Sequence, residues 1–229
     1  MTGVYQIYPR KRKFFLSNFS VNTFLILVNI ISFIIFWILI SFNVKFLDYV
    51  ALKPLNIFYG KYLWTFITSM FMHGNIWHLF VNMLSLFFIG SLIEKILGAK
   101  RYLKFYLISG LFAGIFFVLI EFLFPTNPNI AAVGASGALF GLIGLLMLLT
   151  PNLPVYIMFI PIPIKMKYAA PGILIVLWLI STAPMLFGGE KILIGNTAHL
   201  GGLISGLFYG FYLKKKYANK TEAINKHFS

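Results

Sequence analysis

The stretch that decides the fold class is residues 19–40, which read FSVNTFLILVNIISFIIFWILI. A helix needs about 20 mostly apolar residues to cross a bilayer, and this stretch contains no charged side chain. The apolar part of a secretory signal peptide is shorter, about 7–15 residues, and is followed by small residues at a cleavage site, which are missing here. We therefore expect a membrane-spanning helix rather than a cleaved leader.

Further apolar segments follow at residues 76–93, 102–124, 134–150, 168–187 and 197–213. Hydrophobic residues make up 60% of the chain and charged residues 10%, against roughly 45–50% and about 25% in soluble domains. So few charges could not cover the surface of a soluble fold, and a disordered chain or a coiled coil is excluded as well. The sequence predicts an all-α fold, a polytopic membrane bundle of six transmembrane helices. Its expected parts are a basic segment (1–18), the membrane domain (19–213) and a basic tail (214–229).

The charge pattern predicts the orientation of this bundle. The formal net charge is +14, and if the N-terminus is cytoplasmic, 15 of the 19 lysines and arginines fall on the cytoplasmic side. An excess of basic residues in cytoplasmic loops is the rule for membrane proteins. We expect a multi-pass protein of the cell membrane with both termini in the cytoplasm. The basic ends are then topology signals rather than a nucleic-acid site, and membrane lipid is expected to surround the bundle.

Polar side chains within the apolar segments are costly in lipid and are therefore candidates for function. His78 and Asn82 lie four residues apart, on one face of the second span. Ser136 stands in the sequence Gly-Ala-Ser-Gly at residues 134–137, where the fourth span begins, and His199 stands near the start of the sixth. The second, fourth and sixth spans run in the same direction, so all four side chains lie near the outer face and differ in depth by at most roughly 10 Å.

The grouping of these residues predicts acyl-transfer chemistry. A serine hydroxyl becomes a useful nucleophile when a neighbouring base takes its proton, and His199 is the base available to Ser136. Neither Asp48, in the long loop after the first span, nor Glu121, near the outer end of the third, has a spacing that suggests the third member of a triad. A Ser–His dyad is therefore expected, without a cofactor or metal ion.

Other groups near Ser136 are suited to support this dyad. The Ser136 backbone N–H lies at a helix start, where free amides favour negative charge, and the His78 and Asn82 side chains are further donors for an oxyanion. Phe140, one turn later, is placed to stack on the imidazole of His199. Small residues allow close helix approach in lipid, and the glycines of the fourth and sixth spans form two such stripes: Gly137, Gly141 and Gly144, and Gly202, Gly206 and Gly210.

Structural and non-catalytic explanations remain open for each group. A serine at a helix start is often an N-cap, an intramembrane histidine can bond a facing carbonyl, and Asn82 can join two helices. His73 is either a loop residue or, with His78 and His199, one ligand of a zinc site. A transporter or a client-binding protein without catalysis is also possible. Metalloproteases of the His-Glu-x-x-His type are excluded, and so are proteases with two intramembrane aspartates, because Asp48 is the sole aspartate.

Three motifs together resemble those of the rhomboid family of intramembrane serine proteases. They are HGNIWHLFVN at residues 73–82, GASGALFG at 134–141 and AHLGG at 198–202. The patterns HxxxN, GxSG and AHxxG are highly specific as a set, and the resemblance covers about residues 19–213. It implies that Ser136 is the nucleophile and His199 its base.

The resemblance also implies oxyanion donors and an access route, and the depth of the dyad indicates the kind of substrate. In the family the HxxxN pair helps to form the oxyanion hole, here His78 and Asn82, and Gly134, Gly137 and Gly202 belong to the motifs that support the dyad. The substrates are expected to be single-span membrane proteins cut near the outer leaflet, reaching the site beside the fifth span, under a mobile loop at residues 185–196. One departure is Thr65 after Trp64, where many members have arginine.

Overall fold

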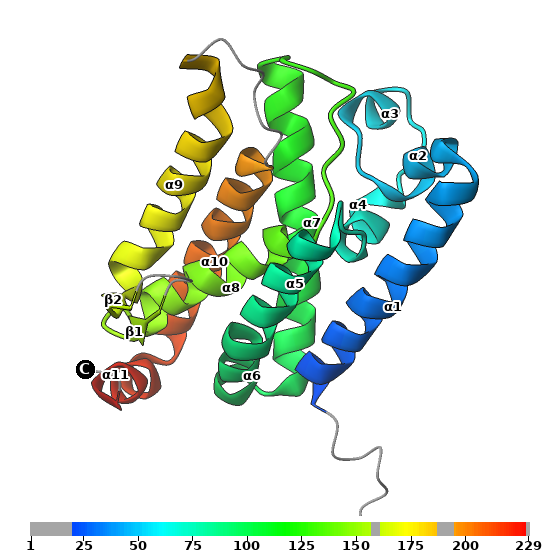
Figure 1. The fold of residues 1–229 in the computed structure, drawn as a ribbon. Helices are drawn as coiled ribbons and strands as arrows, with labels where there is room; N and C mark the ends of the chain where they lie inside the picture. The colour runs from blue at the N-terminus through cyan, green and yellow to red at the C-terminus, as the bar shows by residue number, and fades with distance from the viewer. Residues whose placement is uncertain (1–19, 157–160, 187–194, 228–229) are drawn as a thin grey trace, which may run out of the picture.

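The computed structural model describes residues 20–156, 161–186 and 195–227, and within these ranges the chain is a bundle of helices (Figure 1). The predicted all-α class is confirmed. Most of the loop predicted to cap the site, residues 187–194, lies outside the described residues.

Each predicted span falls on a helical segment with similar bounds. The helices are α1 (Val21–Phe42), α5 (Ile76–Ser85) continued by the π-helical η4 (Leu86–Gly90) and α6 (Ser91–Leu97), α7 (Ala99–Leu123), α8 (Ser136–Leu149), α9 (Met166–Leu186) and α10 (Asn196–Lys216). Three of the described helical segments, Val21–Phe42, Ile76–Leu97 and Ala99–Leu123, are long and apolar enough to cross a membrane by length and composition.

Short elements fill the connections. The loop between α1 and α5 contains η2 (Val44–Phe46), α2 (Leu47–Val50), α3 (Pro54–Phe58), α4 (Thr65–Thr68) and η3 (Ser69–Phe71). The strands β1 (Pro154–Val155) and β2 (Ile164–Lys165) form an antiparallel pair before α9, and α11 (Ala218–His227) follows α10.

A partly buried network of hydrogen bonds joins the start of α1 to α6 and α7. The carboxylate of Glu94 accepts hydrogen bonds from the backbone N–H groups of Val21 and Asn22, each at 2.9 Å. The Tyr102 hydroxyl donates to the Asn22 side-chain oxygen over 2.6 Å. Glu94 thus satisfies amides that a helix start leaves without partners, and its role in the described structure is that of an anchor.

The centre of the bundle is α8, which is short and almost entirely buried between α7 and α10. Fourteen residues make a helix of about 21 Å, less than the thickness of a bilayer core. A Cβ atom added to Gly202 would overlap the carbonyl oxygen of Gly137, and one added to Gly206 would overlap that of Gly141. The two glycine stripes therefore bring the backbones of α8 and α10 into direct contact.

The long loop between α1 and α5 is fastened to the chain just before α8. Leu52 and Ala132 form an isolated antiparallel bridge, with hydrogen bonds of 2.9 and 3.1 Å between their backbones. Thr65 is fully buried, and its hydroxyl donates to the Tyr62 carbonyl over 2.7 Å. The residue that departs from the family pattern therefore has a structural contact of its own within the loop.

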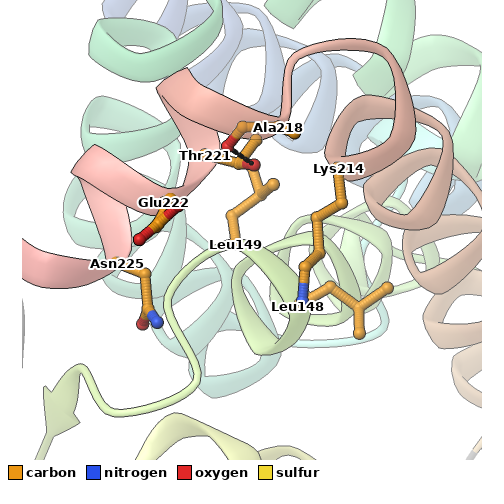
Figure 2. Close-up of a pocket in the computed structure, with 7 residues that line it drawn as sticks. All are labelled: Leu148, Leu149, Lys214, Ala218, Thr221, Glu222 and Asn225. Carbon is orange, nitrogen blue, oxygen red and sulfur yellow. Dashed lines mark hydrogen bonds between the residues drawn. The ribbon is translucent and has the colours of Figure 1, made fainter.

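At the other end of the bundle, α11 folds back beside the end of α8 (Figure 2). The Thr221 hydroxyl donates to the Ala218 carbonyl over 2.9 Å and is turned away from solvent. A pocket of about 220 Å³ lies here, and it is lined by Leu148, Leu149, Lys214, Ala218, Thr221, Glu222 and Asn225. This pocket shares no residue with the predicted dyad.

Candidate active site

Ser136 is the first residue of α8, and its hydroxyl is not used to cap the helix. The N-cap position belongs to Ala135, which makes no side-chain capping bond. Gly134 just before it has φ +114°, a backbone conformation that favours glycine. The Ser136 Oγ instead lies 2.8 Å from His199 Nε2, within hydrogen-bond distance. The structure therefore brings together the two residues predicted as a dyad.

His199 lies in the first turn of α10 and is buried. The Phe140 ring stacks on its imidazole, with centroids 4.6 Å apart and planes inclined by 20°. Within the described part of the chain, His199 Nδ1 has no hydrogen-bond partner. The ring is thus held by stacking and by its contact with Ser136, and no carboxylate of the described residues orients it from the far side.

The two residues predicted as oxyanion donors lie on α5 beside the loop that leads into Ser136. A Cβ atom on Gly134 would stand 2.8 Å from His78 Nε2 and 3.6 Å from Ser136 Oγ, so the His78 ring packs on the Gly134 backbone. The Asn82 amide donates one of its two N–H groups to the His78 carbonyl over 2.8 Å. The Asn75 side chain caps this helix by accepting from the His78 backbone N–H.

His73 lies inside the site, although its sequence position left open whether it is only a loop residue. Its ring is buried and meets the His78 ring edge-on, with centroids 5.2 Å apart. Burial, together with the smaller effect of the nearby His78, lowers the pKa of His73 to about 3. The neutral ring can therefore accept the Ala135 backbone N–H at Nε2, 3.5 Å away. The signal in the sequence was a second histidine five residues before His78.

The loop before Ser136 is therefore held at several points along its length. Besides the Leu52–Ala132 bridge, the Gly134 N–H donates to the Ser69 carbonyl over 2.8 Å. Fixing this loop fixes the direction of the Ser136 side chain and of the amides in the first turn of α8. These amides have no partner within the helix and carry the positive end of its dipole.

The acidic residues considered for a triad have other partners. Asp48 forms an ion pair with Lys53 in the loop after α1. The Glu121 carboxylate accepts from the backbone N–H groups of Thr126 and Asn127, each at 2.6 Å, and this explains a buried acid that the sequence left without a role. In the described ranges, no group of three His, Asp or Glu side chains is placed to hold a metal ion.

Ser136, which is half-buried, touches the buried His199 where two apolar, closely packed helices begin. This arrangement defines a membrane protein with a candidate serine-hydrolase site. The family model described as "Rhomboid domain" matches residues 60–216, which is more than half of the chain. The chain belongs to the rhomboid family.

Curated relatives agree with this assignment. The chain is 35% identical over 151 residues to "RHOMBOID-like protein 5" of Arabidopsis thaliana, covering 66% of this chain and 44% of that protein. It is 30% identical over 145 residues to "Rhomboid protease GluP" of Bacillus subtilis, covering 63% and 25%. It is also 34% identical over 144 residues to "Inactive RHOMBOID-like protein 8" of Arabidopsis thaliana, covering 62% and 36%. The matched region spans less than half the length of these relatives, which include both a protease and a protein named inactive.

Proposed function

We propose that this protein is an intramembrane serine endopeptidase in which Ser136 and His199 form the catalytic dyad. The observation that carries the proposal is the 2.8 Å contact between Ser136 Oγ and His199 Nε2, in which the histidine is buried and the serine half-buried. A non-catalytic member of the family would have no need to keep both residues in this contact. The histidine without a carboxylate partner supports a dyad rather than a triad.

The proposed reaction uses each group in turn. His199 Nε2 takes the hydroxyl proton as Ser136 Oγ attacks the scissile carbonyl carbon, and the oxyanion that forms accepts hydrogen bonds from the Ser136 N–H, His78 and Asn82. The intermediate then expels the amine, which takes the proton from His199 and leaves an acyl-enzyme. Water attacks the ester with His199 again as base, which releases the acid and restores the serine.

The proposed substrate is a single-span membrane protein, and the proposed topology is the one that the charge pattern predicts. Six spans place both termini in the cytoplasm and the dyad near the outer leaflet of the cell membrane. The dyad then cuts a transmembrane segment close to its outer end. A peptide bond within a helix is shielded by its hydrogen bonds, so glycine, proline or other weak helix formers are expected near the cut.

Labelling by a fluorophosphonate probe tests the nucleophile directly. We expect the detergent-purified wild-type chain to be labelled covalently at Ser136 and the Ser136→Ala variant to remain unlabelled, because only a serine activated by a base reacts with this probe. Equal labelling of both proteins would contradict the assignment. No labelling of a folded wild-type chain would favour a client-binding role, as the relative named inactive illustrates.

The oxyanion donors should affect the rate of cleavage without being indispensable. We expect His78→Ala and Asn82→Ala each to lower kcat by up to about 10²–10³-fold, the usual cost of losing one such donor, while the Ser136 amide remains. The measurement is the cleavage rate of a transmembrane substrate in detergent. A double variant with the wild-type rate would show that α5 provides no oxyanion donor.

A further inference from the structure

A pair of basic side chains meets one aromatic ring at the end of the bundle remote from Ser136. The Arg101 guanidinium, on the first turn of α7, lies 5.8 Å from the centre of the Tyr217 ring. The Lys216 ammonium, at the end of α10, lies 5.7 Å from the centre of the same ring. It also donates a hydrogen bond to the Tyr212 hydroxyl over 2.8 Å. Two like charges from different helices are thus gathered around Tyr217.

No described acidic side chain neutralises this pair. In the described ranges, the ion pairs are Lys53–Asp48, in the loop after α1, and Lys226–Glu222, within α11. Glu94 of α6 is bonded to the backbone at the start of α1. The positive charge is raised further by exposed lysines near the start of α7, at the end of α10 and in α11: Lys100, Lys104, Lys214, Lys215 and Lys220. The electrostatic repulsion is relieved most simply by a bound anion.

The helix faces next to this pair are apolar. Phe105 of α7 stacks on Tyr209 of α10, with ring centroids 4.6 Å apart, and so closes the seam between the two helices. Beyond this stack, α7 exposes Ile108 and Phe112, which follow Arg101 at helical spacing on one face. Phe208 of α10 is 70% exposed. The surface therefore pairs a positively charged end with an apolar strip.

We propose that the α7–α10 seam binds an anionic phospholipid, with its phosphate between Arg101 and Lys216 and an acyl chain along Ile108 and Phe112. Charge complementarity selects an anionic headgroup, because arginine and lysine both donate hydrogen bonds to phosphate oxygens. Tyrosine, in turn, is enriched at the membrane interface. The apolar strip identifies a lipid rather than a free phosphate as the occupant. Each basic residue at a membrane surface raises the affinity for anionic lipid by a factor of roughly five.

Native mass spectrometry of the full chain in a non-ionic detergent tests this proposal, with phosphatidylglycerol and phosphatidylcholine as the added lipids. We expect the wild-type chain to retain phosphatidylglycerol in preference to phosphatidylcholine. Arg101→Gln and Lys216→Gln should each weaken phosphatidylglycerol binding about fivefold, and the double variant about 30-fold. The charge-preserving pair Arg101→Lys and Lys216→Arg should retain most of the binding, and thermal unfolding checks that each variant is folded.

The matched control removes two charges elsewhere. Lys165 is the last residue of β2 and Lys167 lies in the first turn of α9, where its ammonium is 5.0 Å from the centre of the Tyr168 ring. We expect the double variant Lys165→Gln with Lys167→Gln to change phosphatidylglycerol binding less than twofold. Equal losses in the two double variants would mean that only net charge matters, and equal retention of the two lipids by the wild-type chain would mean that headgroup charge is not recognised. Either result would overturn the proposal.

Discussion

Ser136→Ala and His199→Ala are each expected to abolish cleavage of a transmembrane substrate while leaving the helical bundle folded. The serine variant removes the attacking oxygen, and the histidine variant leaves the hydroxyl without a base, so either loss stops the same step. In soluble serine proteases one such substitution lowers kcat by about 10⁶-fold. The measurement is the appearance of cleaved substrate with detergent-purified protein, together with circular dichroism to verify folding.

A matched control for this experiment is Ser205→Ala, on the same helix as His199. The Ser205 hydroxyl lies 2.6 Å from the Ser109 hydroxyl, between α10 and α7, and has no contact with the dyad. Its removal costs this hydrogen bond and the one that Ser205 donates to the Gly202 carbonyl over 2.7 Å, each typically about 1 kcal/mol of stability, and leaves the chemistry intact. We expect cleavage to continue in this variant. Wild-type turnover by either dyad variant would refute the proposed function.

Gly206→Ala is expected to cause the largest loss of stability among single substitutions in the glycine stripes. The added Cβ atom would overlap the Gly141 carbonyl oxygen and lie 2.7 Å from the Leu145 backbone nitrogen. Backbone atoms of a buried helix cannot move aside as a flexible side chain does, so α8 and α10 must separate. Overpacking of this kind costs about 3 kcal/mol, and separation would also move Ser136 away from His199.

Thermal unfolding in detergent and the cleavage rate measure this effect, and Gly172→Ala is the control. Gly172 lies in α9, and a Cβ atom there would meet no atom within 4 Å. Alanine is the better helix former by about 1 kcal/mol, so this control should be neutral or slightly stabilising. A Gly206→Ala protein with the stability and activity of the control would show that the α8–α10 contact tolerates a wider spacing.

The sequence was sufficient where the physical cause is local. Long apolar segments predict helices because the bilayer demands them, and the helix bounds agree with residues 19–40, 76–93 and the later segments to within a few residues. Motif spacing likewise located Ser136 and His199 at helix starts. The family resemblance drawn from these motifs agrees with the matching domain model.

Other features could not be found in the sequence because they depend on contacts between distant residues. The role of Glu121 became clear only from the two amides that it accepts after the end of α7. The position of His73 depends on the fold of the α1–α5 loop, which places its ring beside Ala135. The meeting of Arg101 with Lys216 at one tyrosine depends on how α7 and α10 cross.

By itself, then, the sequence determined that this chain is a helical membrane protein and which polar residues are candidates for its chemistry. Hydrophobicity and helical periodicity are properties of neighbouring residues, and they can be recognised without knowledge of the fold. Only the tertiary structure decided that Ser136 and His199 lie 2.8 Å apart. Contact at that distance requires α8 and α10 to pack backbone against backbone through Gly202 and Gly206, and such packing is set by helix rotation and crossing as well as by residue spacing.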